Sequence, residues 1–124
     1  MKRILIADDN KLIRLALREA LQGEGVGIFE TDNGKEALQW FESCHPDLLI
    51  MDIKMPQMDG MEVLKRIRLI DEQVPIIIAT AYKGMENDPE IALGNVSAFM
   101  TKPIDIGVLR LKVKEILGRK GKGK

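Results

Sequence analysis

Five apolar runs punctuate the sequence, and four of them end next to a side chain that could take part in chemistry. The run DLLIM, for example, stops at a carboxylate before the turn-forming stretch KMPQMDG. A charge at the edge of a protein core is costly unless another group pairs with it or uses it. The candidate groups at the ends of the four runs are Asp8, Asp9, Asp52, Thr80 and Lys102.

A site that combines three carboxylates, a hydroxyl and an ammonium could carry out phosphoryl transfer. Neighbouring carboxylates at a partly buried place repel one another by about a few kcal/mol per pair. A hard cation relieves that repulsion, and carboxylates with a backbone carbonyl and water are ligands that Mg²⁺ prefers. The metal and a lysine neutralise phosphoryl oxygens while one carboxylate attacks in line. Asp52 is the candidate nucleophile because it stands alone on its run, opposite Asp8 and Asp9.

Each residue also has a purely structural explanation. Asp8 or Asp9 could cap the helix that follows, and Asp52 could cap a turn. Thr80 could simply close a strand, and Lys102 could be one more surface lysine. Their joint occurrence at the ends of successive runs favours a common site over these separate explanations.

The runs alternate with segments of helical period. They cover residues 3–7, 26–30, 47–51, 75–79 and 96–100, and they lack two-residue alternation, as strands buried on both faces do. Strand and helix alternating five times predict an α/β fold, a doubly wound five-stranded parallel sheet with right-handed crossovers. Ligands of such sheets bind outside the carboxyl ends of the strands, which places the candidate groups at one edge.

Helix boundaries are marked by capping residues and glycines. Asn33 and Asp59, each with a glutamate three residues on, predict the starts of the second and third helices, and Asp105 can cap the fifth. Gly23 and Gly25 are expected to end the first helix. The core-facing residues expected in the first helix, 11–21, are Ile13, Ala16, Leu17, Ala20 and Leu21, and those in the last are Ile106, Leu109, Val113, Ile116 and Leu117.

Composition indicates one globular domain, assigned to residues 1–118, in a chain of 124 residues. No apolar stretch is long enough for a bilayer, and the single cysteine, Cys44, fits a reducing, cytoplasmic interior. Four of the 19 basic residues lie in 118–124, which leaves 15 against 19 acidic residues and argues against a nucleic-acid-binding surface on the domain. The basic tail, 119–124, could contact an anionic partner, although Gly-Lys alternation is typical of a flexible, solvated end.

The stretches ILIADDN, DLLIMDIKMPQMDG, IIIATAY and AFMTKPI resemble, in this order and over essentially the whole chain, the receiver domain of two-component response regulators. The length, DIK and TAY resemble stand-alone receivers of the sporulation-phosphorelay type. The resemblance implies a flavodoxin-like (βα)5 fold with strand order 2-1-3-4-5. It also implies a phosphoacceptor signalling protein that catalyses only its own phosphorylation and dephosphorylation, and is otherwise not an enzyme.

The resemblance implies a role for each acidic residue. Asp52 would accept a phosphoryl group from the phosphohistidine of a sensor histidine kinase or a histidine phosphotransferase. Mg²⁺ would be the cofactor, held directly by Asp9, partly through water by Asp8, and by Asp52. The backbone carbonyl of Lys54 would be a further ligand.

Other residues would respond to the phosphoryl group. Thr80, the amide of Ala81 and Lys102 would bind its oxygens. Phe99 would be the switch aromatic, whose ring turns inward as Thr80 moves. The resemblance further implies a cis peptide bond between Lys102 and Pro103.

The resemblance leaves the role of two positions open, and the sequence departs from the family at a third. Lys54 and Tyr82 lie where the family tunes the lifetime of the acyl phosphate, and they could shield it from water or lie in solvent. Pro89 falls inside the usual fourth helix, so a short helix over about 88–94, capped by Asp88 and preceded by the loop YKGMEN, is predicted. This leaves open whether the face formed by helix 4, strand 5 and helix 5 signals in the usual way.

Partner surfaces are expected at exposed apolar residues. The family docks its kinase on the first helix and on the loop after the last strand, which here present Leu12, Leu15, Pro103 and Ile104. Val108 and Leu111 are candidates for a dimer or output surface. A downstream protein target is expected, with no direct contact to nucleic acid or membrane.

Three alternative functions are weaker candidates. A phosphatase of the haloacid-dehalogenase kind would want a second acid two residues after the nucleophile, where this chain has Lys54. A flavin or nucleotide carrier would need a glycine- or hydroxyl-rich loop after the first strand, where this chain has DDNK. An inert receiver-like binding module would fit the same fold, although every chemical position is filled.

Overall fold

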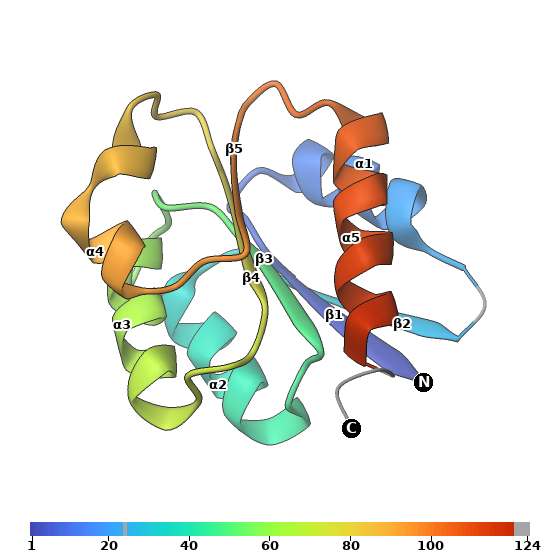
Figure 1. Ribbon diagram of the computed structural model, residues 1–124, viewed down its shortest axis with the longest axis horizontal. Helices are drawn as coiled ribbons and strands as arrows, with labels where there is room; N and C mark the ends of the chain where they lie inside the picture. The colour runs from blue at the N-terminus through green and yellow to red at the C-terminus, as the bar shows by residue number, and fades with distance from the viewer. Residues whose placement is uncertain (24, 121–124) are drawn as a thin grey trace.

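The computed structural model describes residues 1–23 and 25–120. In this part five strands form one sheet in the order β2-β1-β3-β4-β5, and every neighbouring pair is parallel (Figure 1). The strands are β1 (Lys2–Ala7), β2 (Val26–Thr31), β3 (Leu48–Met51), β4 (Ile76–Thr80) and β5 (Ala98–Thr101). The helices are α1 (Lys11–Leu21), α2 (Gly34–Cys44), α3 (Gly60–Ile70), α4 (Pro89–Leu93) and α5 (Ile106–Lys120), with a 3-10 turn, η1, at Met85–Asn87. The predicted fold class and strand order are confirmed.

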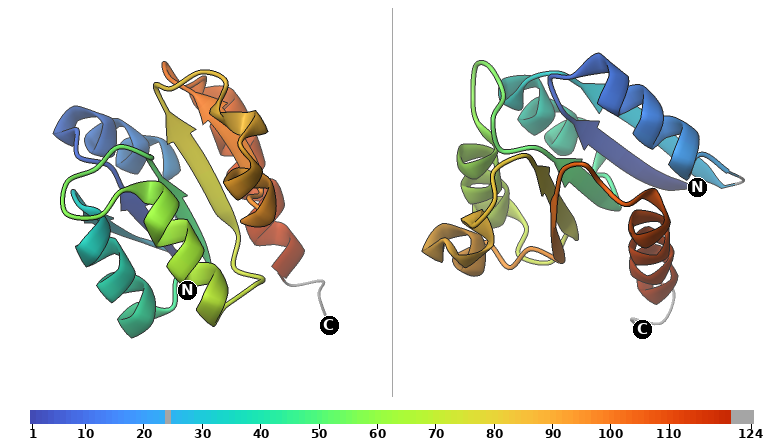
Figure 2. Two further views of the ribbon diagram at one scale, coloured as in Figure 1. Left: turned by 90° about the vertical axis from the view of Figure 1, so that its left-hand side faces the viewer. Right: turned by 90° about the horizontal axis from the view of Figure 1, so that it is seen from above.

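Helices cover both faces of the sheet (Figure 2). Along β1, Ile4 and Ile6 pack with residues of α1 and α5, whereas Leu5 and Ala7 pack with residues of α2 and α3. All four side chains are fully buried, which explains why the runs lack two-residue alternation. Full burial of such an isoleucine or leucine contributes about 1.5–3 kcal/mol relative to exposure, so the central strands fix the edge at which the candidate groups emerge.

The predicted caps of three helices are confirmed. Asn33, Asp59 and Asp105 each accept a hydrogen bond on a side-chain oxygen from the amide three residues on, at 2.7, 3.0 and 3.1 Å. The two glutamates of the predicted capping boxes act elsewhere. Glu36 accepts from the hydroxyl at the end of β2, and Glu62 pairs with an arginine one turn further along α3.

The core-facing stripe of α1 is narrower than predicted. Leu17 and Leu21 are buried and Ile13 and Ala20 are partly buried, but Ala16 is exposed, so the prediction for Ala16 is wrong. At about 100° per residue, Ala16 lies at the border of the predicted arc, and the arc that reaches the sheet does not extend that far.

The last strand begins later than the apolar run that predicted it. Asn95 has a positive φ of 52°, and the chain turns there before it joins the sheet. The Ser97 amide then donates to the Ile76 carbonyl at 2.7 Å, and paired residues begin at Ala98. Val96 contributes to the core from the loop instead of from the strand.

The short fourth helix is confirmed. Asp88 caps it by accepting from the Glu90 amide at 2.8 Å, and Pro89 occupies its first turn, where the missing N–H removes no hydrogen bond. Gly84, with a φ of 87°, leads into η1, so part of the predicted loop YKGMEN is a 3-10 turn.

The apolar pattern of α5 is confirmed. Leu109, Val113 and Ile116 are buried against the sheet, while Val108 and Leu111 are exposed. Residues 121–124 of the predicted tail lie outside the described residues. None of the helices in the described part, α5 included, combines the length and the apolar character needed to cross a membrane.

Candidate functional site

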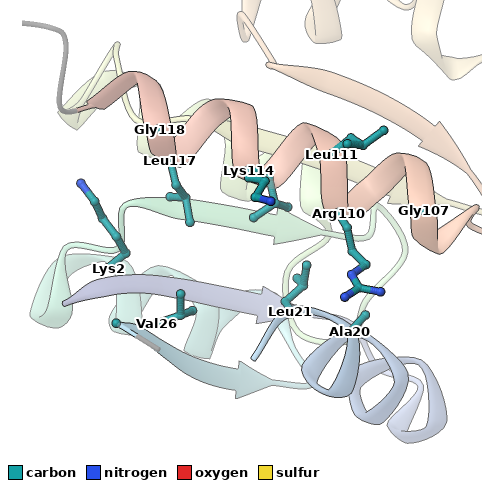
Figure 3. Close-up of a pocket in the computed structure, with 12 residues that line it drawn as sticks. Lys2, Ala20, Leu21, Val26, Gly107, Arg110, Leu111, Lys114, Leu117 and Gly118 are labelled. Carbon is teal, nitrogen blue, oxygen red and sulfur yellow. The ribbon is translucent and has the colours of Figure 1, made fainter. Parts of the chain in front are cut away.

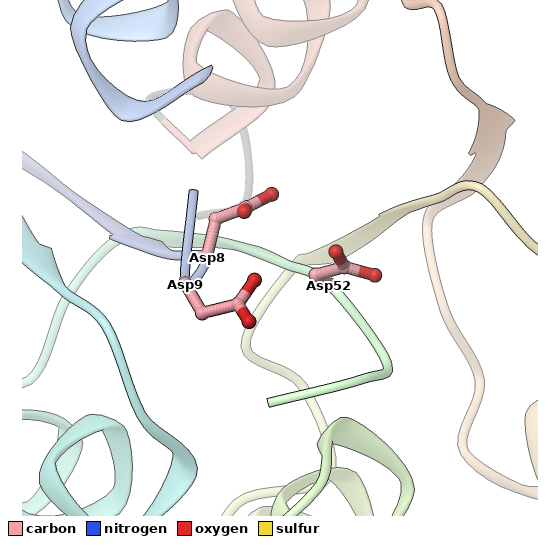
Figure 4. Close-up of side chains that lie close together, drawn as sticks. All are labelled: Asp8, Asp9 and Asp52. Atoms are coloured by element: carbon pink, nitrogen blue, oxygen red, sulfur yellow. The ribbon is translucent and has the colours of Figure 1, made fainter. Parts of the chain in front are cut away.

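Three carboxylates meet at the carboxyl edge of the sheet. Asp8 and Asp9 follow β1, and Asp52 follows the neighbouring strand β3 (Figure 4). One carboxylate oxygen of each residue lies within 4.8 Å of the corresponding oxygen of the other two. Asp8 and Asp52 are buried, and Asp9 is exposed. The acidic cluster predicted from the strand ends is therefore present.

The parallel ladder fixes the backbone of both buried carboxylates. The Asp8 amide donates to the Thr31 carbonyl at 3.1 Å, and the Asp52 amide donates to the Ala7 carbonyl at 2.9 Å. Each aspartate thus continues the register of its strand by one residue beyond the sheet. The side chains are set by the same geometry that buries the core.

The start of α3 presses on the backbone of Asp52. The Gly60 amide donates to the Ile53 carbonyl at 2.6 Å, and a Cβ on Gly60 would lie 2.2 Å from the Asp52 carbonyl oxygen. This approach is closer than any side chain allows. Only glycine lets α3 begin against the residue that follows β3.

Replacing Gly60 with alanine is therefore expected to destabilise the fold by about 1–3 kcal/mol, since the Asp52 backbone must move. The measurement is urea unfolding followed by circular dichroism. The matched control is Gly118→Ala in α5, where a Cβ meets no atom of the described part of the chain within 4 Å. That control should gain about 0.5–1 kcal/mol from helix propensity, and equal effects of the two substitutions would contradict the proposed steric role of Gly60.

Lys102 bridges the two buried carboxylates. Its Nζ donates to Asp8 Oδ2 at 2.7 Å and to Asp52 Oδ2 at 2.8 Å. The Lys102 amide donates to the Thr80 carbonyl at 2.8 Å, and the following Lys102–Pro103 bond is cis, as the resemblance implied. Lys102, which is expected to pair with a phosphoryl group on Asp52, is thus already in contact with the Asp52 carboxylate.

Burial and hydrogen bonding have opposite effects on the pKa values of Asp8 and Lys102. Burial raises the pKa of Asp8, while the hydrogen bond from Lys102 acts in the opposite direction and is outweighed. For Lys102, burial alone lowers the pKa, but the hydrogen bonds to Asp52 and Asp8 outweigh it, and the net pKa is raised. The ammonium therefore stays charged and holds together carboxylates that would otherwise repel each other.

The capping explanation for the acidic pair does not hold. Asn10 caps α1, accepting on its Oδ1 from the amides of Leu12 at 2.9 Å and Ile13 at 3.1 Å. Asp8 instead accepts from the Asn10 amide at 2.9 Å, so it supports the cap from outside the helix. Within the described residues, Asp9 accepts no hydrogen bond and joins no ion pair, which leaves its carboxylate available to a ligand.

This set of donors fits a divalent cation. Three carboxylates and one ammonium leave a formal charge of minus two, which one Mg²⁺ would neutralise, and all the ligand atoms are hard oxygens. Lys54, in the loop after Asp52, has a backbone carbonyl that accepts no hydrogen bond in the described part of the chain. Both oxygens of Asp8 and of Asp52 already accept a hydrogen bond, so Asp9 contributes the one carboxylate of the cluster without a hydrogen bond in the described part of the chain.

The remaining predicted residues lie around the cluster. Thr80 ends β4, next to β3; it is fully buried, and its Oγ1 accepts from the Tyr82 amide at 3.3 Å. Ala81 follows it on the surface. Phe99 lies within β5, pairs with Ile78 and is half-buried against the core on the α2 and α3 side of the sheet. It lies inside a strand and does not join the cluster directly.

One contact near the site was not predicted. The Nζ of Lys54 lies 5.7 Å from the centroid of the Tyr82 ring, so the loops after β3 and β4 are joined by a cation–π contact. A hydrogen bond to the Tyr82 side chain raises the pKa of Lys54. The sequence singled out both residues, but nothing in it showed that they meet.

Comparison with known proteins agrees with this geometry. The family described as the response regulator receiver domain matches residues 4–114. Sporulation initiation phosphotransferase F of Bacillus subtilis is 42% identical over 117 residues, which cover 94% of each chain. The polar-differentiation response regulator DivK of Brucella anthropi is 33% identical over 119 residues, covering 94% of this chain and 97% of DivK.

Solved structures give the same result. The response regulator protein TrrA of Thermotoga maritima, in complex with Mg(2+)-BeF, has a TM-score of 0.84 and 40% identity, covering 94% of this chain and 99% of that one. A CheY-like receiver domain protein of Methanospirillum hungatei has a TM-score of 0.89 and 29% identity, covering 99% of both chains. The chain belongs to the response regulator receiver domain family.

Proposed function

We propose that this receiver accepts a phosphoryl group on Asp52 in a Mg²⁺-dependent reaction, from the phosphohistidine of a histidine kinase or histidine phosphotransferase in the cytoplasm. The observation that carries the proposal is the Lys102 ammonium between two buried carboxylates, with the exposed Asp9 carboxylate beside them. Such a site concentrates positive charge where phosphoryl oxygens would lie and presents one carboxylate as the nucleophile.

Asp52 is oriented for attack by two hydrogen bonds. Its Oδ1 accepts from the Ile53 amide at 2.6 Å, and its Oδ2 accepts from Lys102. An oxygen of Asp52 would form the new bond to phosphorus as the phosphorus–nitrogen bond of phosphohistidine breaks, and that electron pair would return to the imidazole. Lys102 would then pair with an oxygen of the transferred group. The same site would release the group to water, and so the chain would catalyse its own phosphorylation and dephosphorylation.

The metal would be held by the carboxylates of Asp8, Asp9 and Asp52 and by the Lys54 carbonyl. When bound, Mg²⁺ supplies positive charge to phosphoryl oxygens. Asp9 is the exposed member and Asp8 the buried one, in keeping with direct ligation by Asp9 and partly water-mediated ligation by Asp8. The Mg²⁺ in the related TrrA complex supports this assignment.

The conformational response would begin at Thr80. Its buried hydroxyl and the amide of Ala81 would bind the phosphoryl oxygens, and the movement of Thr80 would free space for Phe99. The half-buried position of Phe99 on the edge strand β5 supports this role. A downstream protein target would then recognise the altered surface.

The kinase or phosphotransferase would dock beside the site. Leu12 is 75% exposed and Leu15 is 49% exposed on α1, although both are large apolar side chains. Pro103 is exposed and Ile104 is half-buried in the loop after β5. These four residues would form the docking patch, within reach of a phosphohistidine aimed at Asp52.

The direct test is intact-mass spectrometry of the protein after incubation with acetyl phosphate, with Mg²⁺ or with EDTA. A gain of one phosphoryl group in Mg²⁺ alone, absent in Asp52→Asn, is expected. The matched control is Asp59→Asn, which keeps the cap of α3 because asparagine caps helices as well as aspartate. If the protein gained no phosphoryl group in either condition, an inert binding module would be the better description.

A further inference from the structure

A groove lies between α1 and α5, on the face of the sheet that these two helices cover (Figure 3). Its volume is about 720 Å³, within the range of ligand-binding clefts. The floor is apolar and consists of Ala20, Leu21, Val26, Val113 and Leu117, which belong to the edge of the core beneath. The groove therefore runs along the outer edge of the core, where Val26 and Leu117 are partly exposed.

The groove is open because the residues around it are small. Ala20 on α1 and Gly107 and Gly118 on α5 contribute little or no side chain, and Gly25 lies before β2. A Cβ on Gly25 or on Gly118 would meet no atom of the described residues within 4 Å.

The walls of the groove are basic. Lys2, Arg110 and Lys114 line it, and no carboxylate lines it among the described residues. None of these three cations forms an ion pair in the described part of the chain, in contrast to Arg14 and Arg18, which both pair with Glu30. The sequence adds four more basic residues directly after Gly118, in a chain whose other residues are net acidic.

We propose that this groove docks an acidic amphipathic helix of a partner protein. The apolar floor matches the apolar stripe of such a helix, and the unpaired cations match carboxylates on either side of the stripe. From Gly107 to Gly118 the groove follows α5 for about 16 Å, at 1.5 Å per residue, which is the length of about three helical turns. The apolar floor and the basic walls thus both fit the same ligand, an acidic amphipathic helix.

Other occupants fit less well. A second copy of the chain placed by two-fold symmetry would set Arg110 and Lys114 against the same cations. A bilayer is met by several projecting apolar side chains. Here Leu111 is the one exposed large apolar residue among the described lining residues, at 69%, whereas Leu21 and Val113 are only 9% and 6% exposed at the bottom of the groove. Nucleic acid would use the cations but leave the apolar floor uncovered.

The groove is separate from the proposed kinase-docking patch. That patch uses Leu12 and Leu15 near the start of α1, whereas the groove uses Ala20 and Leu21 at its end. Binding here does not require phosphorylation of Asp52. The proposal therefore stands independently of the proposed phosphoryl transfer, and its test contains no phosphoryl donor.

The probe is a synthetic helical peptide of four turns, with leucines spaced i, i+3, i+4, i+7 and glutamates flanking them. It is titrated into ¹⁵N-labelled protein without Mg²⁺, and amide shifts are recorded by NMR. Saturable shifts are expected at the groove residues, and binding should weaken as salt is added. The double substitution Arg110→Glu/Lys114→Glu should weaken binding at least about tenfold.

Four comparisons decide the proposal: two further double variants, a lysine version of the peptide, and titrations with anionic vesicles or duplex DNA in place of the peptide. Lys65→Glu/Lys112→Glu, an equal charge reversal at exposed lysines outside the groove, should bind the peptide as the unmodified protein does. Arg110→Gln/Lys114→Gln repeats the test with a smaller change in charge, in case the reversal perturbs the fold. The proposal is overturned if both charge reversals weaken binding equally, or if a lysine version of the peptide shifts the same amides. It is also overturned if no saturable shift occurs, or if only anionic vesicles or duplex DNA shift the groove amides.

Discussion

Replacing Lys102 with methionine is expected to lower the free energy of unfolding by about 3 kcal/mol at pH 7 in EDTA. The substitution removes the ammonium that lies 2.7 Å from Asp8 and 2.8 Å from Asp52, while methionine keeps much of the apolar stem. Both carboxylates are buried, so water cannot replace the lost hydrogen bonds. Urea unfolding curves of the two proteins give the difference directly.

The pH dependence of this difference follows from two pKa values. The pKa of Lys102 is raised above its usual 10.5, so the stability from its charge is present below pH 10.5 and is lost as pH rises through the raised value. At the acid end, burial raises the pKa of Asp8 above 3.8. Protonation of Asp8 removes its negative charge, and the stabilising ion pair with Lys102 is lost. The two proteins should therefore differ most near neutral pH and converge toward both extremes.

Mg²⁺ should reduce the difference. A divalent cation among the same oxygens would neutralise the carboxylates that the substitution leaves unpaired, so the variant should gain more stability from Mg²⁺ than the unmodified protein does. Lys112→Met, at an exposed lysine of α5, is the control and should change stability by less than about 0.5 kcal/mol. If Lys102→Met and Lys112→Met behaved alike in EDTA, the bridging role assigned to Lys102 would be wrong.

The convergence of these groups was predictable because it depends on topology alone. The carboxyl ends of parallel strands share one edge, so Asp8, Asp52 and Lys102 had to emerge together once the strands were recognised. Pro89 was equally informative, since proline is tolerated only in the first turn of a helix and so fixed where α4 begins. Such predictions need the order of the elements and no distances.

Other features depend on distances that the sequence does not contain. Three residues in a row, Asp8, Asp9 and Asn10, are all good caps, and a shift of one residue in the start of α1 decides which of them acts. The contact between Lys54 and Tyr82 depends on the paths of two loops. The groove likewise depends on how far α1 and α5 stand apart, which is set by packing across the sheet.

Replacing Asp9 with asparagine should separate the stability of the fold from its capacity to bind metal. In the described structure the Asp9 carboxylate accepts no hydrogen bond, and its charge lies within 4.8 Å of those of Asp8 and Asp52. Removing a repulsion of this range at a solvent-exposed position should stabilise the metal-free protein by about 1 kcal/mol. The gain should shrink as salt is added, because the group is exposed and screened.

In Mg²⁺ the order of stability should change. At a Mg²⁺ concentration one hundred times the dissociation constant, binding stabilises the unmodified protein by about 2.7 kcal/mol, and Asp9→Asn should lose most of this because it removes a ligand. Thermal unfolding in EDTA and across a Mg²⁺ series measures both effects, with Asp32→Asn as the control at an exposed aspartate outside the cluster. A variant that is less stable than the unmodified protein in EDTA, or equally stabilised by Mg²⁺, would mean that Asp9 serves the fold and not the metal. If Asp9→Asn is more stable in EDTA and gains less stability from Mg²⁺, the Asp9 carboxylate lowers the stability of the metal-free fold and raises its affinity for a cation. Both effects have one cause, the repulsion between Asp9 and the carboxylates of Asp8 and Asp52.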